Sequence, residues 1–304
     1  MKKIRVGIIG YGYLGKAVEK HICADSRFKP IVIFSRRNIK ANQMNVESID
    51  NIEKYIGKID IMFICTGSLN DVKQTTFKCL KYFNTIDAFD THKKINNYIN
   101  ACDLIAKENK KVAFCSFGWD PGIFSIMRVL FKSIKGEAYT TWGKGISQGH
   151  SEAIRTIKYV KDAVQYTIPN KNIVKLIKGG EKVKISNLHK RLCYVVCERN
   201  KEQFIKDKIL NMPNYFKGQN TYVHFVDNSN IKKYKKLYHK GEVFTQGNIM
   251  SFKIKTNSNS ELTAKIMIAY SYILNGLYKE NRFGAYSILD IPIGNLLNNA
   301  NKFI

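Results

Sequence analysis

Two aspartates of this 304-residue chain, Asp90 and Asp120, each end an apolar, strand-like stretch. If the two stretches are parallel strands of one sheet, their carboxyl ends meet at the same edge and place both acids on one rim. Paired carboxylates can hold a substrate ammonium group and then take its proton, directly or through water. Their proximity also tends to raise one of the two pKa values. We therefore expect both to be catalytic, although the sequence leaves open which is the general base, and either alone would also suit a turn.

A glycine-rich turn near the amino terminus is the second chemical feature. The apolar stretch IRVGII runs directly into Gly10, Gly12 and Gly15, spaced G-x-G-x-x-G, and a helix-like stretch follows. In dinucleotide-binding folds such glycines permit a tight turn, a close approach to the pyrophosphate and helix–strand packing. The N–H groups at the start of the helix then face the phosphates. We expect cofactor contacts from Gly10, Tyr11, Gly12, Tyr13, Leu14 and Gly15.

The second apolar stretch, KPIVIF, ends in Ser35, Arg36 and Arg37. An NAD site usually has an acid at this point, which binds the ribose 2′-hydroxyl. Guanidinium groups instead suit a 2′-phosphate, because their planar fork of donors matches its oxygens. The sequence therefore predicts NADP as cofactor; ordinary solvated arginines are the alternative.

Alternating strand-like and helix-like stretches must position these groups. KIDIMFICTGS, NTIDAFD and KKVAFCSFGWDPG read as strands, and the stretches at 71–83 and 95–109 read as helices. Repeated βα units predict an α/β fold with a Rossmann-type doubly wound parallel sheet over residues 1–120. Where these strands end we expect further cofactor contacts from Cys65, Thr66, Gly67, Ser68, Ala88, Phe89, Asp90, Phe117, Gly118, Trp119, Asp120 and Pro121.

Beyond Pro121 the sequence changes character. Long stretches rich in Tyr, Val, Ile and Thr predict a second, α+β domain over residues 121–260 that carries an open, largely antiparallel sheet. One of these strand-like stretches, which carry polar interruptions, spans residues 242–256. Residues 261–304, including 284–297, read as helices that complete the first domain.

Composition limits the remaining classes of function. The net charge of +26 would attract nucleic acid, but the lysines are scattered and no nucleic-acid motif accompanies them. No apolar run approaches the ~20 residues of a membrane helix, so we expect a cytoplasmic protein. The seven cysteines, Cys193 and Cys197 in CYVVC among them, form no C-x-x-C pair, and we expect reduced thiols and no metal site.

Several longer motifs together indicate a family. The stretches IGYGYLG, IFSRR, IDAFDTH, FGWDPGIFSI, ISQGHSEAIR, AVQYTIP, HKRLC and MPNYF occur in this order over about the whole chain. In them the sequence resembles the meso-diaminopimelate dehydrogenases. The resemblance implies a homodimeric, NADP-dependent enzyme that reversibly deaminates the D-centre of meso-2,6-diaminopimelate to L-2-amino-6-oxopimelate and ammonia. Such a reaction belongs to the synthesis of lysine and cell-wall precursors.

The resemblance also implies a set of substrate-binding residues beside Asp90 and Asp120. Trp142 would line the substrate pocket and Trp119 would lie by the nicotinamide, although core packing is the commoner role of Trp. The family more often has Asp at the position of Glu152, His150 could be merely structural, and Asn257 could replace Asn259 as the counterpart. The remaining members of the set are Gln148, Gly149, His150, Ser151, Glu152, Thr167, Arg191, His239 and Asn259.

Three other functions remain open at this point. A different NADP-linked reductase, acting on a sugar or a cyclic imine, would be expected to carry a lysine–histidine pair, which we do not find at the strand ends. A catalytically silent NADP-binding regulator would bind the cofactor without oxidising an amino acid. A basic module would bind nucleic acid at physiological salt.

Overall fold

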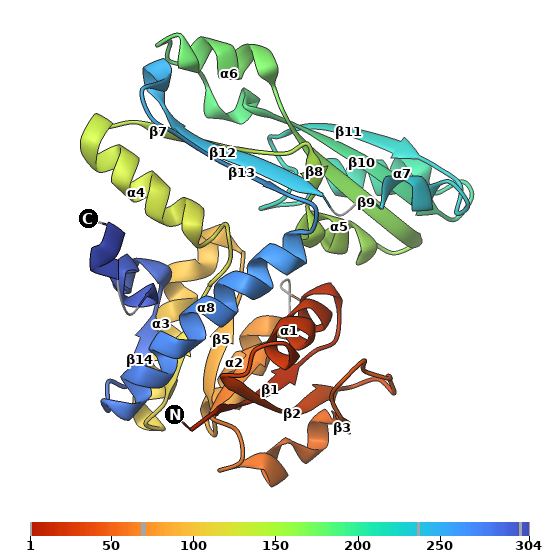
Figure 1. Ribbon diagram of the computed structural model, residues 1–304. Coiled ribbons are helices and arrows are strands. Elements are labelled where there is room, and N and C mark those ends of the chain that lie inside the picture. Colours follow the sequence, from red (N-terminus) through yellow and green to blue (C-terminus); the bar gives the residue numbers. More distant parts are fainter. Residues whose placement is uncertain (1, 68–70, 236–237, 298–299, 304) are drawn as a thin grey trace. The chain divides into compact units, whose positions relative to one another are not determined.

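The computed structural model describes residues 2–67, 71–235, 238–297 and 300–303 (Figure 1). The chain divides into two compact units, Met1–Ile126 with Ser260–Ile304, and Met127–Asn259. The first unit thus combines both ends of the chain, whereas the second is one continuous segment.

In the described part of the first unit, seven strands form one sheet in the order β14-β6-β5-β4-β1-β2-β3. Every strand pair in it is parallel. From β3 to β6 this is the Rossmann order, in which the direction of winding reverses between β1 and β4, and the predicted fold class is confirmed. The strands are β1 (Ile4–Ile9), β2 (Phe28–Ser35), β3 (Val46–Ser48), β4 (Ile61–Ile64), β5 (Asn84–Asp87), β6 (Val112–Phe114) and β14 (Gly284–Tyr286).

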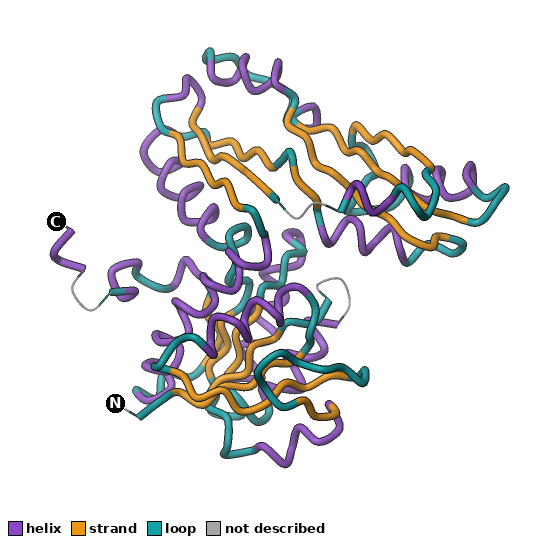
Figure 2. Tube along the Cα trace, turned by 45° about the vertical axis from the view of Figure 1, so that its right-hand side comes forward, coloured by secondary structure: helices purple, strands orange, loops and turns teal. Residues whose placement is uncertain are grey.

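Helices accompany these strands, as the strand–helix alternation of the sequence predicts. β4 and β5 are buried at every residue, which is typical of central parallel strands with both faces covered. Figure 2 shows the strands lying side by side with helices around them. The helices are α1 (Tyr13–Cys23), α2 (Asp71–Leu80), α3 (Ile95–Glu108) and α8 (Asn259–Lys279).

The prediction of a helix over residues 284–297 is wrong. Residues 284–286 form strand β14, which pairs with β6, and short 3-10 turns follow at Ile288–Asp290 and Ile293–Leu296. Gly284 has a φ of +137°, and a Cβ there would lie 2.7 Å from Oδ1 of Asp103. The backbone needs this close approach because Asp103 also accepts a hydrogen bond from the N–H of Ala285. Pairing to the sheet edge thus overrides the local helical pattern.

The second unit contains two sheets in its described residues, where the sequence predicted one. Their orders are β11-β10-β9-β8 and β13-β12-β7. All pairs are antiparallel except β10 with β11, so the largely antiparallel character is confirmed. The strands are β7 (Ala138–Trp142), β8 (Gly145–Ile146), β9 (Val160–Pro169), β10 (His189–Cys197), β11 (Asn220–Phe225), β12 (His239–Thr245) and β13 (Ser251–Thr256).

The strand-like stretch 242–256 lies in a hairpin, with a turn between the antiparallel strands β12 and β13. Gly247 and Asn248, with φ values of +72° and +53°, reverse the chain between β12 and β13. Left-handed conformations of this kind suit Gly and Asn. The helices of this part of the chain are α4 (Ile123–Lys135), α5 (Gln148–Arg155), α6 (Lys171–Lys178) and α7 (Glu202–Leu210).

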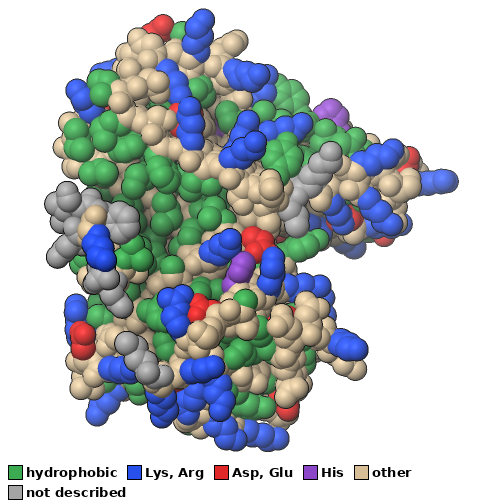
Figure 3. All heavy atoms as spheres, in the orientation of Figure 1, with side chains coloured by type: hydrophobic (Ala, Val, Ile, Leu, Met, Phe, Trp, Pro, Cys, Tyr) green, Lys and Arg blue, Asp and Glu red, His purple; other side chains and the backbone are tan. Residues whose placement is uncertain are grey.

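The positive charge is distributed over the surface. Figure 3 shows Lys and Arg side chains spread over the visible face, with few Asp or Glu among them. Among the described residues, no helix is both long and apolar enough to span a membrane.

Candidate active site

The carboxyl edge of the seven-stranded sheet carries the predicted chemistry of the first unit. Gly10 follows β1, Ser35 ends β2, and Cys65 follows β4. Asp90 lies three residues beyond β5, and Asp120 follows the turn after β6. Because all of these strands are parallel, the structure brings the glycine turn, the arginine pair and both acids to the same edge.

The glycine turn has the shape that a dinucleotide requires. Gly10 has a φ of +93°, and a Cβ there would lie 2.7 Å from the carbonyl oxygen of Cys65; a Cβ on Gly15 would lie 2.1 Å from that of Gly10. Both glycines therefore serve packing within the chain. A Cβ on Gly12 would meet no atom of the described residues within 4 Å, so packing among them does not require a glycine there. Gly12 immediately precedes α1 and has no side chain that could cap the start of this helix. The turn fits a bound diphosphate.

Tyr11 links this turn to the loop after β2. Its buried hydroxyl donates to Oε2 of Glu19 at 2.5 Å and accepts the N–H of Asn42 at 3.1 Å. Glu19 is fully buried and also accepts the N–H groups of Gln43 and Met44. Burial and the bond to Glu19 raise the pKa of Tyr11 to about 12. Sequence reasoning missed Glu19, whose side chain lies on the buried face of α1. By contrast, Tyr13 is exposed and Leu14 half-buried.

The residues at the end of β2 are partly engaged with one another. The Ser35 hydroxyl accepts the N–H of Arg37 at 3.0 Å. The exposed guanidinium of Arg36 pairs with Asp71 at 2.5 Å, at the start of α2. A ligand phosphate would compete with Asp71 for Arg36.

Some of the remaining predicted cofactor residues can offer a ligand only backbone atoms, and others can also offer a side chain. Phe89 and Phe117 are buried in aromatic clusters, with ring centroids 4.3 Å from Tyr98 and 4.5 Å from Phe114 respectively, so they can offer only backbone atoms to a ligand. Burial raises the pKa of the Cys65 thiol. The Thr66 hydroxyl has no partner among the described residues. Gly67, Ala88 and Pro121 also lie in the described strand-end loops, whereas Ser68 lies outside the described residues.

The turn that carries Asp120 is built on two glycines. A Cβ on Gly122, whose φ is +138°, would lie 1.6 Å from the carbonyl oxygen of Gly118. The N–H of Gly118 donates to the carbonyl of Pro121 at 3.0 Å. Trp119 is buried and packs edge-on against Phe124, with centroids 5.0 Å apart. Asp120 itself is half-buried, as is Asp90.

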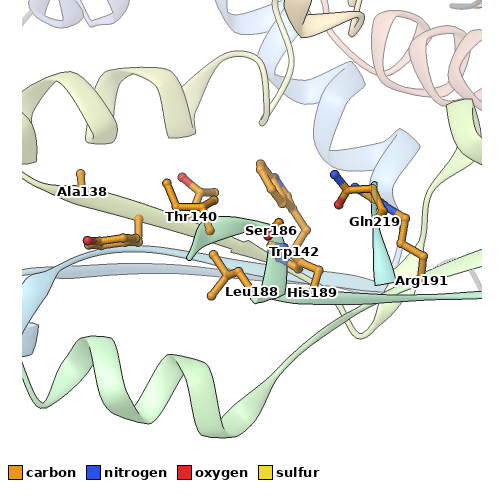
Figure 4. A pocket seen from close by; sticks show the side chains of 10 residues that line it. Ala138, Thr140, Trp142, Ser186, Leu188, His189, Arg191 and Gln219 are labelled. Atoms are coloured by element: carbon orange, nitrogen blue, oxygen red, sulfur yellow. The ribbon is translucent and has the colours of Figure 1, made fainter. Parts of the chain in front are cut away.

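In the second unit, a cavity of about 480 Å³ contains two of the predicted substrate residues, Trp142 and Arg191 (Figure 4). Sequence reasoning missed His189, although it lies two residues before Arg191 and therefore on the same face of β10. The other lining residues are Ala138, Tyr139, Thr140, Ile185, Ser186, Leu188 and Gln219.

Arg191 is the main charged group of this cavity. Its Nη1 donates to Oγ1 of Thr167 at 3.2 Å, and the two residues face each other in the β9–β10 pair. Its buried Nε has no hydrogen-bond partner among the described residues, and no carboxylate within them pairs with the guanidinium. Burial lowers the pKa of Arg191. A guanidinium in this situation suits a ligand carboxylate, which would satisfy the remaining donors.

His189 supports Trp142. Its Nε2 accepts the backbone N–H of Trp142 at 3.0 Å, and the two rings lie 5.1 Å apart (Figure 4). Burial, together with the positive charge of Arg191, lowers the pKa of His189 to about 4. The imidazole is therefore neutral near pH 7, with its proton on Nδ1.

The predicted substrate loop SQGHSE is the start of helix α5. Gln148 is its first residue and Gly149 is buried; Glu152 is half-buried. Ser151 donates to the carbonyl of Ser147 at 2.7 Å and accepts the N–H of Gln165 at 2.9 Å, so its hydroxyl serves the fold. His150 bonds to Ser147 at 2.8 Å through Nδ1 and packs edge-on against Tyr215.

The cavity lining does not include three other predicted substrate residues, Thr167, His239 and Asn259. Thr167 reaches it only through Arg191. His239, at the start of β12, is buried against Gly145, where a Cβ would lie 2.6 Å from the imidazole. Asn259 is the first residue of α8 and half-buried, whereas Asn257 is exposed.

Two of the cysteines, Cys193 and Cys197, lie on strand β10. Burial raises the pKa of Cys193 to about 12, and that of Cys197 is also raised. No group of three possible metal-binding side chains occurs within the described residues.

Comparison with known proteins gives consistent matches. The model of the diaminopimelic acid dehydrogenase C-terminal domain matches residues 118–265. The meso-diaminopimelate D-dehydrogenase of Ureibacillus thermosphaericus is 38% identical over 97% of this chain and 95% of its own. The Corynebacterium glutamicum DAP dehydrogenase in complex with DAP has a TM-score of 0.93, with 32% identity over 100% of this chain and 98% of its own. An engineered D-amino acid dehydrogenase bound to NADP+ has a TM-score of 0.91, with 30% identity over 98% of this chain and 97% of its own.

Proposed function

The chain belongs to the meso-diaminopimelate D-dehydrogenase family, and from this premise we propose the reaction it catalyses. It is an oxidoreductase that reversibly deaminates the D-centre of meso-2,6-diaminopimelate to L-2-amino-6-oxopimelate and ammonia. The observation that carries the proposal is the Arg191 guanidinium, which lines a cavity of about 480 Å³ with no carboxylate partner among the described residues. A ligand with a carboxylate at its far end supplies what this group lacks.

The cofactor is a nicotinamide dinucleotide, and we propose NADP. Gly10, Gly12 and Gly15 would hold its diphosphate against the uncapped start of α1. Arg36 and Arg37, with Ser35, would bind the 2′-phosphate through charge-assisted hydrogen bonds. When bound, the nicotinamide supplies the hydride acceptor of the reaction.

The two acids act on the reacting amino group. At neutral pH the substrate nitrogen is an ammonium, and its lone pair must be freed before the α-carbon is oxidised. Asp90 and Asp120 would first hold the ammonium by charge and then take its proton, directly or through water. Either carboxylate can be the base.

The far, non-reacting centre determines which amino acids are accepted. Arg191 would bind its carboxylate, and the neutral His189 would hold Trp142 at the cavity wall. A site built to hydrogen-bond a polar group discriminates strongly against ligands that lack it, because its donors would then stay unsatisfied. Gln148, Gly149, Glu152, Thr167, His239 and Asn259 complete the proposed set of substrate residues.

The proposal is tested by following reduced nicotinamide through its absorbance at about 340 nm. We expect reduction of NADP with meso-diaminopimelate, and little with the LL isomer or D-alanine. Binding of NADP with no absorbance change for any amino acid would instead indicate a catalytically silent regulator. Reduction with the LL isomer at the same rate would contradict the assignment to the D-centre.

We also propose that two copies of the chain form a homodimer. Three apolar side chains of α4, Val129, Leu130 and Ile134, are each more than two-fifths exposed, and an interface would remove them from water. Light scattering of the purified protein tests this, and a monomer mass at assay concentration would contradict it.

A further inference from the structure

One buried carboxylate stands directly behind the two candidate catalytic acids. Asp87 is the last residue of β5 and is fully buried. Its Oδ1 accepts the N–H of Phe89 at 2.9 Å and the N–H of Ser116 at 3.0 Å. Phe89 immediately precedes Asp90, and Ser116 begins the turn that carries Asp120. One oxygen atom therefore joins the backbones of both acid-bearing loops.

Two further contacts fix the arrangement. The carbonyl oxygen of Asp87 accepts the N–H of Phe117 at 2.8 Å. Its Oδ2 accepts the hydroxyl of Tyr98 at 2.6 Å. Tyr98, on α3, packs in turn on the ring of Phe89, with centroids 4.3 Å apart. The carboxylate thus has a donor on each oxygen, and each donor comes from an element bordering the acid rim.

Ser116 shows that this contact shapes the backbone. Its φ is +66°, in the left-handed region that non-glycine residues rarely adopt. Its own hydroxyl has no partner among the described residues, so the side chain does not explain the conformation. Two hydrogen bonds to Asp87, from the N–H of Ser116 to Oδ1 and from the N–H of Phe117 to the carbonyl oxygen, help to hold this conformation, since backbone strain persists only where the surroundings enforce it.

We propose that Asp87 is a positioning residue, which sets the spacing of Asp90 and Asp120 by accepting hydrogen bonds from both of their loops. This inference rests on the proposed function, because it assigns Asp87 to the same acid pair. Both carboxylates must reach one nitrogen, and a misplacement of about 1 Å can cost about a hundredfold in rate. Burial raises the pKa of Asp87, with Tyr98 and the two N–H groups opposing the shift. Asp87 touches no reacting atom in this scheme.

The same strand offers a matched control. Asn84 begins β5, is also buried, and also joins neighbouring strands: its Nδ2 donates to the carbonyl of Asp60 and its Oδ1 accepts the N–H of Val112, both at 2.9 Å. It lies at the amino end of β5, away from the acid rim. Asp87→Leu and Asn84→Leu each leave buried backbone groups without partners, and only Asp87→Leu does so behind the acids.

The experiment measures kcat, KM and the thermal midpoint for both variants and for Asp87→Asn. We expect Asp87→Leu to lower kcat about a hundredfold. Asn84→Leu should lose comparable thermal stability and keep kcat within about twofold. Asp87→Asn keeps an oxygen for the two N–H groups and should retain kcat within about fivefold. If the two Leu variants had the same kcat, the proposal would be overturned.

A second readout does not depend on activity. Amide hydrogen exchange of the peptides containing Phe89 and Ser116 should accelerate in Asp87→Leu and stay unchanged in Asn84→Leu; unchanged exchange in both would also overturn the proposal. If Asp87→Leu does not fold, it is measured in a Ser116→Gly background, because Gly adopts positive φ without strain. A wild-type enzyme inactive on meso-diaminopimelate would refute the proposed function, while the exchange result would still decide whether Asp87 holds the two loops.

Discussion

Two buried or partly buried ionisable groups, Asp87 in the first unit and Arg191 in the second, differ in how they are satisfied. Asp87 lies beneath the loops that carry the two candidate catalytic acids, and Arg191 lines the cavity. Asp87 receives donors on both carboxylate oxygens from its own chain. Within the described residues the Arg191 side chain makes one hydrogen bond, to Thr167, and its buried Nε has no partner. The acid rim is therefore complete before any ligand binds, whereas the cavity wall lacks an anion.

This difference assigns distinct tasks to the two regions. Donors fixed by the backbone position a catalytic group without reorganisation during the reaction. A desolvated cation without a partner costs stability, and a ligand that supplies the missing charge recovers it. The rim is thus suited to chemistry, and the cavity wall to recognising a carboxylate.

The largest effect is expected from Arg191→Met, which removes the cation and keeps its bulk. The loss of charge-assisted bonds to a carboxylate should lower kcat/KM for meso-diaminopimelate about a hundredfold or more. The unliganded protein should gain about 1 kcal/mol of unfolding free energy, because a largely buried charge without a carboxylate partner is removed. Steady-state kinetics and urea unfolding measure the two effects.

Lys190→Met is the control for this change. Lys190 is exposed and lies on the opposite face of β10 from Arg191. Neither quantity should change in this variant. A large loss of unfolding free energy in Arg191→Met would mean that the guanidinium is already satisfied, and the contrast between the two regions would fail.

Substitutions in the glycine turn test which glycines serve packing within the chain and which serve the cofactor. Gly15→Ala puts a Cβ 2.1 Å from the carbonyl oxygen of Gly10, and the backbone shift should cost about 2–3 kcal/mol of unfolding free energy. Gly12→Ala meets no protein atom, so stability should hold while NADP affinity falls about tenfold. Chemical denaturation and fluorescence titration separate the two. If Gly12→Ala bound NADP as tightly as the wild type, the assignment of the turn to the diphosphate would be wrong.

Substitutions of Arg36 and Arg37 test the proposed preference for NADP over NAD. Replacing Arg36 and Arg37 with Ala should weaken NADP about thirtyfold and NAD about twofold or less, since only NADP carries the 2′-phosphate. Asp71→Asn releases Arg36 from its ion pair and should leave NADP affinity unchanged or slightly higher. Lys29→Ala, exposed at the other end of β2, is the control. Equal losses for both cofactors would contradict the preference for NADP.

Sequence reasoning succeeded where local patterns decide the structure. The parallel sheet follows from the alternation of strand-like and helix-like stretches, and the residues that end the strands lie at its carboxyl edge. It failed where pairing with a distant segment decides. β14 forms because Gly284 approaches Asp103 closely and pairs with β6, and nothing within residues 284–297 shows that neighbour.

The same reason explains which site residues were missed. Asp87 has an ordinary strand-end position, and only the fold brings the N–H of Ser116 to it. The position of His189 beside Arg191 could have been predicted from the sequence, because residues two apart in a strand share a face. The sequence alone does not show the role of Ser151, because its hydroxyl accepts the N–H of Gln165, which is distant in the chain.

The smallest effect concerns His189 and the pH dependence of stability. Its pKa lies near 4 in the folded chain, below the usual 6.5. The unfolded chain therefore binds more protons between these values, and stability falls as the pH drops through this window. From about pH 7.5 to about pH 5.5 the wild type should lose about 1 kcal/mol more unfolding free energy than His189→Gln, whose side-chain oxygen can still accept the N–H of Trp142.

Urea unfolding at the two pH values measures this difference. His224→Gln, which changes an exposed imidazole, should behave as the wild type does. In the Arg191→Met background the contribution of His189 should shrink, because the neighbouring positive charge is one of the two causes that lower its pKa. An unchanged contribution would show that burial alone keeps His189 neutral, and that the cation of the cavity acts on a ligand but not on the wall that surrounds it.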